Sequence, residues 1–181
     1  MISGKDRRIC GVRCRSAKRV VRARYPAAVH VCDGASAGAL IAPFAFLGPS
    51  YDEALRSVFA SGEMGNLLQS DGLSGLLGTG HYKTAPLREL IARHVDAQVL
   101  AAIAKEYRAG RHLYVVTTNI DAQRTAIWDM GKIAASDDPN APELFRNILT
   151  ASASIPGVFS PVFIDVEAGD GISRKCMSTA G

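Results

Sequence analysis

The feature that most constrains this chain is a short apolar run that leads into a serine between two glycines. Residues 27–32 (AAVHVC) have the length of a strand, and Gly34-Ala-Ser-Ala-Gly38 follows almost at once. Small residues then open a helical stretch that runs from Ser36 to about Phe46. A strand, a tight turn and a helix in this order predict a layered α/β structure with Ser36 on the turn.

The turn has two interpretations. A serine hydroxyl needs an activating base to become a nucleophile, and a sharp strand-to-helix turn would lift the Ser36 Oγ clear of the sheet edge. The N–H of Ala37, at the start of the helix, would then point at a developing oxyanion. In the alternative, Ser36 is a turn residue that caps a core helix. The candidate site is therefore Ser36 as nucleophile, with Gly34, Ala37 and Gly38 as the elbow and oxyanion residues.

Strands and helices alternate along the rest of the chain. Residues 113–119 are apolar on both faces, which is typical of a buried central strand, whereas the glycine-dense residues 62–82 have the composition of a loop. Pro43 should end or kink its helix, and Thr84 can cap the next long one. Further strands are expected at 125–130 and 162–166, and further helices at 51–59, 84–94, 97–107 and 142–152. This order predicts an α/β fold with a largely parallel sheet.

The charges are distributed unevenly. The formal net charge is +4, but residues 1–30 hold one acidic residue, Asp6, against nine basic ones: Lys5, Arg7, Arg8, Arg13, Arg15, Lys18, Arg19, Arg22 and Arg24. Such a start is typical of an organelle presequence or a nucleic-acid-binding arm. No aromatic platform or nucleic-acid motif accompanies it, so nucleic-acid binding is not expected. No run of 18 apolar residues and no signal-peptide core occurs, which predicts one cytoplasmic domain.

The four cysteines do not form a metal-binding pattern. Cys10 and Cys14 lie four residues apart, and no second pair of Cys or His follows at zinc-finger spacing. Without a secretory signal, disulfides are not expected for these two residues or for Cys32 and Cys176. The sequence predicts no metal and no cofactor.

No histidine completes a serine triad. The order in α/β-hydrolases is Ser, then Asp or Glu, then His. His30 precedes Ser36, His81 lies in the glycine-dense stretch, and His94 lies on an apolar helix face. His112 begins the central strand, which is the wrong end for a site at the carboxyl edge of a sheet. A histidine-dependent hydrolase that uses His81 or His112 stays as a weaker alternative.

Several motifs taken together resemble a bacterial patatin-like phospholipase. They are Gly34-Ala-Ser-Ala-Gly38 with Ala39-Leu40, Thr84-Ala-Pro-Leu87, Thr117-Thr-Asn119, Trp128 and Ala151-Ser-Ala-Ser-Ile-Pro156. The resemblance implies a three-layer α/β/α fold with a mainly parallel sheet. It also implies hydrolysis of lipid acyl esters by a Ser–Asp dyad, with Ser36 as the serine and the aspartate in a later Asp-Gly-Gly or Asp-Gly-Ala. Ser152 and Ser154 are expected to pack at a helix end and not to take part in catalysis.

Two parts of the family pattern are missing. The glycine-rich oxyanion loop survives at best as Ser3-Gly4, which leaves Gly4 as a weak oxyanion candidate. No Asp-Gly-Gly follows the last predicted strand, and Asp170-Gly171 is interpreted as a turn. The N-terminal part of the sheet is therefore expected to be irregular, and the dyad aspartate is expected to be absent.

The genetic code offers an explanation for both losses. Residues 175–181 can be encoded so that a shifted frame gives Met-His-Val-Asp-Gly-Gly, the form that the aspartate motif takes in the family. Residues 9–21 and 31–33 can likewise be encoded so that shifted frames give the helix and strand that the family places there. We hypothesise that about residues 7–33 and 169–181 are translated out of frame.

These inferences divide the chain into a basic segment (1–33), an incomplete patatin-like domain (34–168) and an out-of-frame tail (169–181). The expected function is that of a lipid acyl hydrolase of the phospholipase A type, acting on a lipid or acyl-ester substrate with peripheral membrane contact. Its activity is expected to be very low because the dyad aspartate is missing. The alternative is a non-enzymatic protein, either a folded remnant or a basic-tailed binding module.

Overall fold

A computed structural model describes residues 7–9, 12–15, 31–60, 84–156, 159–160, 162–168 and 171–179. The helices in these ranges are α1 (Ala37–Leu47), η1 (Pro49–Tyr51), α2 (Asp52–Ala60), α5 (Ala85–His94), α6 (Ala97–Arg108), α7 (Met130–Ala134) and α8 (Ala141–Ala153). The strands are β1 (Arg7–Ile9), β2 (Val12–Arg15), β3 (Val31–Ala35), β4 (His112–Asn119), β5 (Arg124–Asp129), β6 (Val162–Ala168) and β7 (Gly171–Thr179). The helices and strands expected from residue 51 onward are confirmed, and α7 and β7 are additional. The expected loop at 62–82 lies outside the described residues.

The described strands form one sheet in the order β1-β2-β3-β4-β7-β6, with β5 also paired to β4. Among these strands β3 and β4 pair in parallel, and the other pairs are antiparallel. The sheet thus differs from the mainly parallel one that was expected. Three of the five antiparallel pairs among the described strands, β1–β2, β4–β5 and β6–β7, join strands that only two to four residues separate in the sequence. So few residues can only reverse the chain, whereas a parallel pair needs a long crossover. The strand pair β1–β2 at the N-terminal end was not expected either.

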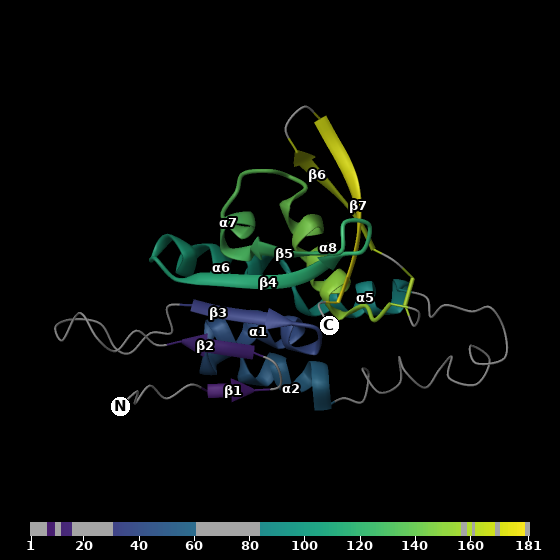
Figure 1. Cartoon of the computed structure of the whole chain (residues 1–181). Helices are drawn as coiled ribbons and strands as arrows, with labels where there is room; N and C mark the ends of the chain where they lie inside the picture. Colours follow the sequence, from purple (N-terminus) through teal and green to yellow (C-terminus); the bar gives the residue numbers. More distant parts are fainter. Residues whose placement is uncertain are drawn as a thin grey trace, which may run out of the picture.

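The described helices lie together on one face of the sheet. α1, α7 and α8 contact β4, and they contact one another either directly or through α6 (Figure 1). Leu113, Val115 and Thr117 of β4 face this layer and are fully buried, while the alternate residues are half-buried. The largest fully buried side chains include Phe46, Ile103, Phe145, Ile148 and Leu149. The α/β class is confirmed, with one helical layer among the described residues.

The strand and helix around Ser36 approach each other closely. β3 continues through Gly34 to Ala35, so the strand ends later than expected. A Cβ added at Gly34 would lie 2.7 Å from the Gly38 carbonyl oxygen and 2.8 Å from the Ala42 Cβ. Small residues are therefore required here by the packing of α1 on β3. Pro43 does not end α1, which continues to Leu47.

Two local expectations are wrong. Cys32 is disulfide-bonded, contrary to the expectation from the redox compartment, because the pairing of cysteines also depends on which strands the fold brings together. Thr84 stands before α5 but makes no side-chain cap with that helix. Its Oγ1 donates instead to the Ser160 carbonyl oxygen at 2.9 Å, so a tertiary partner replaces the local one.

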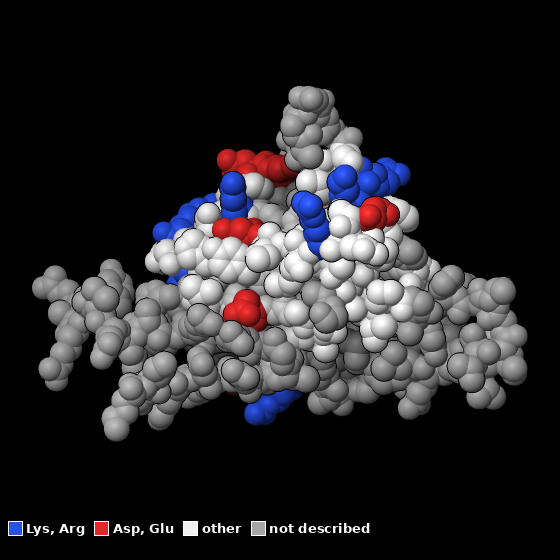
Figure 2. Space-filling model, viewed as in Figure 1, with Lys and Arg blue, Asp and Glu red and all other residues white. Residues whose placement is uncertain are grey.

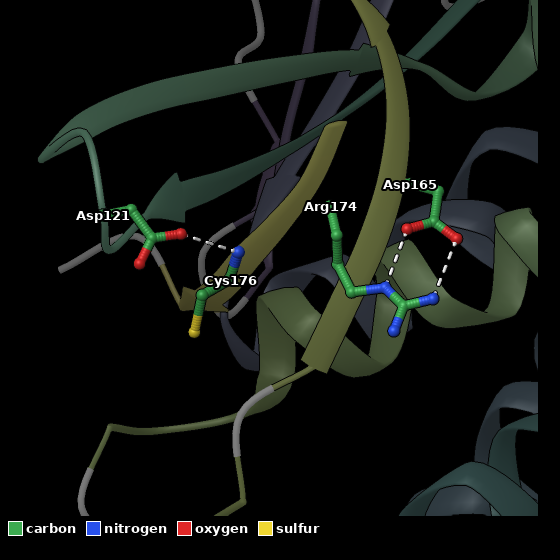
Figure 3. Close-up of polar contacts among 4 residues, drawn as sticks. All are labelled: Asp121, Asp165, Arg174 and Cys176. Atoms are coloured by element: carbon green, nitrogen blue, oxygen red, sulfur yellow. Dashed lines mark hydrogen bonds and ion pairs between the residues drawn. The ribbon is translucent and has the colours of Figure 1, made fainter. Parts of the chain in front are cut away.

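Polar contacts join two pairs of residues at the β6–β7 hairpin (Figure 3). Arg174 Nε donates to Asp165 Oδ1 at 2.9 Å across the two strands, and the Cys176 N–H donates to Asp121 Oδ2 at 3.1 Å. Burial, and then the negative charge of Asp121, raise the pKa of the Cys176 thiol. None of the helices in the described part of the chain is long and apolar enough to cross a membrane.

The close packing at Gly34 predicts a large effect from one methyl group. Gly34→Ala should lower the free energy of unfolding by about 1–3 kcal/mol, because α1 must move away from β3 to admit the Cβ. Ala101→Val, which adds carbon atoms on the exposed face of α6, should cost below about 0.7 kcal/mol. Urea unfolding followed by circular dichroism measures both, and equal losses would contradict the packing argument.

The raised thiol pKa predicts slow alkylation of Cys176. At neutral pH little thiolate is present, so iodoacetamide should react slowly and faster as the pH rises. Asp121→Asn removes a negative charge that raises this pKa, so the variant should react faster at the same pH. Asp165→Asn, which removes a hairpin carboxylate paired with Arg174, should leave the rate unchanged. Mass spectrometry of the Cys176 peptide measures the rates, and identical rates in all three proteins would exclude the effect of Asp121.

Candidate active site

Ser36 occupies a strained turn between β3 and α1. Its backbone has φ 54° and ψ −132°, a combination that costs on the order of 1–3 kcal/mol for a residue with a side chain. The Ser36 side chain makes no cap hydrogen bond to α1, all of whose residues are described. A serine that caps a helix has extended backbone angles and uses its oxygen for the cap. The geometry does not fit the capping alternative and leaves the hydroxyl available for chemistry.

The start of α1 supplies backbone donors next to Ser36. Ala37 is the first residue of the helix and is exposed, whereas Gly38 is buried against β3. The Ala39 N–H donates to the Ser36 carbonyl oxygen at 2.9 Å. The first N–H groups of a helix have no intrahelical partner, and the helix dipole favours negative charge there. The N–H of Ala37 is one of these first helical donors, and its role as an oxyanion donor stays a prediction. Gly4 lies outside the described residues.

Ser152 contacts the turn through a hydrogen bond that the expected helix-end packing did not include. The Ser36 N–H donates to the Ser152 Oγ at 3.2 Å, and the Ser152 hydroxyl donates to the Val116 carbonyl oxygen at 2.7 Å. Ser152 is fully buried. Ser154, by contrast, donates within its own helix to the Thr150 carbonyl oxygen at 2.7 Å. The expected helix-end packing describes Ser154 and is incomplete for Ser152.

β3 and β7 meet end to end along one edge of β4. Ala35 lies opposite Val116 and Thr179 lies opposite Thr117, while β5 occupies the other edge at the same level. Figure 1 shows β7 descending toward the arrowhead of β3. The Ser36 turn, which directly follows Ala35, is therefore next to the end of β7.

Thr179 is the residue that β7 brings to this position. Its N–H donates to the Ser154 carbonyl oxygen at 2.9 Å. Its Oγ1 is buried and has no hydrogen-bond partner among the described residues. The neighbouring Thr117 Oγ1 accepts a hydrogen bond from the Trp128 Nε1 at 2.8 Å. This bond joins two residues of the motifs named in the sequence. No sequence pattern predicts a functional role for Thr179 itself. The position is included only in the out-of-frame hypothesis for residues 175–181.

His112 lies away from Ser36 along the strands. His112 is level with Val31 at the start of β3, four residues before the level of Ala35, which corresponds to roughly 13 Å along the strands. Its Nδ1 is 3.9 Å from the Asp129 Oδ2, and its ring stacks on Tyr114. Burial, followed by the charge of Asp129, raises the pKa of Tyr114. His30 and His81 lie outside the described residues.

His94 lines a small apolar cavity between α1, α5 and α8. The cavity has a volume of about 10 Å³ and its other lining residues are Leu40, Phe44, Leu90, Ile91, Val95 and Leu149. This volume corresponds to about one water molecule, so the cavity does not accommodate an acyl chain.

Charges of both signs are interspersed over the described part of the surface in Figure 2. The described residues contain no group of three or more His, Cys, Asp or Glu that could hold a metal ion.

Comparison with known proteins places the chain in a family. A model of the family described as patatin-like phospholipase matches residues 11–173, which is most of the chain. A comparison with curated proteins found no match. The matched range includes the Ser36 turn, the start of α1 and the end of α8. The chain belongs to the patatin-like phospholipase family.

Proposed function

We propose that Ser36 is the nucleophile of a lipid acyl hydrolase, the activity that the family supports. The observation that carries the proposal is the strained backbone of Ser36, whose hydroxyl is not used to cap α1. The Ser36 Oγ attacks the ester carbonyl carbon, the Ala37 N–H binds the oxyanion, and the alcohol leaves with the serine proton. Water then hydrolyses the acyl-enzyme to release the fatty acid and restore the hydroxyl.

The base of this reaction is the weak part of the proposed site. In a Ser–Asp dyad the aspartate accepts the serine proton and passes it to the leaving alcohol. At the end of β7, next to the Ser36 turn, this chain carries Thr179, whose neutral hydroxyl does not act as a base at pH 7. Loss of one member of a catalytic unit costs several orders of magnitude in rate. We therefore infer that turnover by this chain is very slow.

The out-of-frame hypothesis accounts for the threonine. The shifted reading of residues 175–181 draws its Asp codon from the last base of Ser178 and the first two bases of Thr179. The strand register brings Thr179 to the Ser36 turn, so the restored aspartate would stand beside the nucleophile. Sequencing of the gene decides the matter, because codons that exclude the shifted readings would reject the hypothesis.

A fluorophosphonate probe tests the role of Ser36. The full chain should be labelled slowly at Ser36, as located by mass spectrometry, and Ser36→Ala should not be labelled. Ser57→Ala, which removes an exposed serine of α2, should be labelled like the unaltered chain. Hydrolysis of p-nitrophenyl esters should stay near the blank. An adduct elsewhere, or none, would favour the non-enzymatic alternative. Rapid turnover that vanishes in Ser36→Ala would contradict the missing base.

Restoration of the carboxylate tests the position of the base. Thr179→Asp should raise ester hydrolysis by about 10–100-fold, which is at or below the lower end of the roughly 10²–10⁴-fold that a well-positioned general base contributes. Thr179→Asn has nearly the same shape and should give no increase. The reaction needs the ionised aspartate, so the Thr179→Asp rate should rise with pH through the pKa of that carboxyl, which burial raises, and then level off. A gain of the same size in Thr179→Asn would show that the base is elsewhere.

A further inference from the structure

We propose that Ser152 is a positioning residue that holds the Ser36 turn in its strained conformation. The inference rests on the proposed function of Ser36, and it assigns a role to a hydroxyl that does not itself touch the reacting atoms. Ser152 lies at the end of α8, far from Ser36 in the sequence, and its Oγ contacts the turn and β4 at once.

The hydrogen-bond chemistry fixes the direction of both contacts. A hydroxyl has one proton to donate and lone pairs to accept. The Val116 carbonyl oxygen can only accept, so the Ser152 proton points toward it at 2.7 Å. The lone pairs of Ser152 then face the Ser36 N–H at 3.2 Å. Because Ser152 has no exposed surface, water does not readily replace either partner.

These two bonds act on the peptide that sets the direction of the nucleophile. The N–H of Ser36 belongs to the peptide group that joins Ala35 to Ser36, and its orientation helps to determine where the Ser36 Cβ and the Ala37 N–H point. At φ 54° a residue with a side chain tends to relax toward negative φ. Ser152 opposes this relaxation by fixing the peptide to Val116 of β4, which lies opposite Ala35.

The same bond limits which backbone N–H groups can bind the oxyanion. The Ser36 N–H is used by Ser152, so the donors begin at Ala37. Loss of the Ser152 hydroxyl would leave the Ser36 N–H and the Val116 carbonyl oxygen without their bond and would loosen the turn. The change would reach the nucleophile without altering any residue of the Gly34–Gly38 motif.

Ser154 provides a matched control. It lies two residues further along the end of α8 and is 2% exposed. Its Oγ donates to the Thr150 carbonyl oxygen within the same segment. Ser154→Ala therefore removes a buried hydroxyl of the same size while the bond to Ser36 stays intact.

Amide hydrogen exchange of the full chain tests the bond directly. Loss of one hydrogen bond should speed exchange of the Ser36 amide in Ser152→Ala by about tenfold. Ser154→Ala should leave this amide unchanged, and peptides from α6 should keep their protection in both variants. Ser152→Cys, which keeps the volume and weakens the bond, should give an intermediate rate and serves as the test if Ser152→Ala does not fold.

Chemical labelling of Ser36 gives the functional readout. The rate of reaction with a fluorophosphonate should fall in Ser152→Ala by about tenfold and stay unchanged in Ser154→Ala. Unchanged exchange and labelling in Ser152→Ala, or equal changes in the two alanine variants, would overturn the role of Ser152. If the unaltered chain is not labelled at all, the proposed function fails, and the exchange of the Ser36 amide still decides whether Ser152 holds the turn.

Discussion

The close approach of α1 to β3 is the constraint on which the rest of the described structure depends. Gly34 has no side chain, and an added Cβ would collide with the Gly38 carbonyl oxygen and the Ala42 Cβ. Because the helix packs this tightly against the strand, the chain must turn within a single residue, Ser36, and that residue takes a positive φ. The strain at Ser36 is therefore a consequence of packing, and the contacts with α8 and β4 that hold it follow from the same arrangement.

Much of the fold follows from local patterns, whereas the strand pairing does not. Leu87, Leu90 and Ile91 recur at helical spacing, and all three are buried on α5. The strand β4 combines β-branched residues with a buried face, so it was also predictable. β7 has neither pattern, since its sequence GISRKCMST is polar and does not alternate. Its place in the sheet comes from pairing with β6 and β4, and such long-range pairing leaves little trace in one short segment.

The candidate site divides in the same way. Ser36 and its small neighbours could be named from the sequence because a tight turn demands those residue types at fixed spacing. The contact between Ser36 and Ser152 joins residues 116 positions apart, and a single sequence carries no record of it. Thr84 shows the opposite case, because its local cap was predicted while its partner is Ser160. Local rules thus identify the candidate nucleophile, and tertiary contacts determine what surrounds it.

The end-to-end meeting of β3 and β7 makes the site sensitive to changes of length. The residue of β7 that comes to lie beside Ser36 is chosen by the pairing of Thr117 with Thr179. A slip of one residue would exchange the two faces of the strand and bring a different side chain to that place. An insertion or deletion in the β6–β7 hairpin would therefore change which side chain lies beside Ser36, even though every residue near Ser36 in the sequence stayed the same. In this architecture the residue that β7 places beside Ser36 depends on the register of the strand as much as on substitutions at one position.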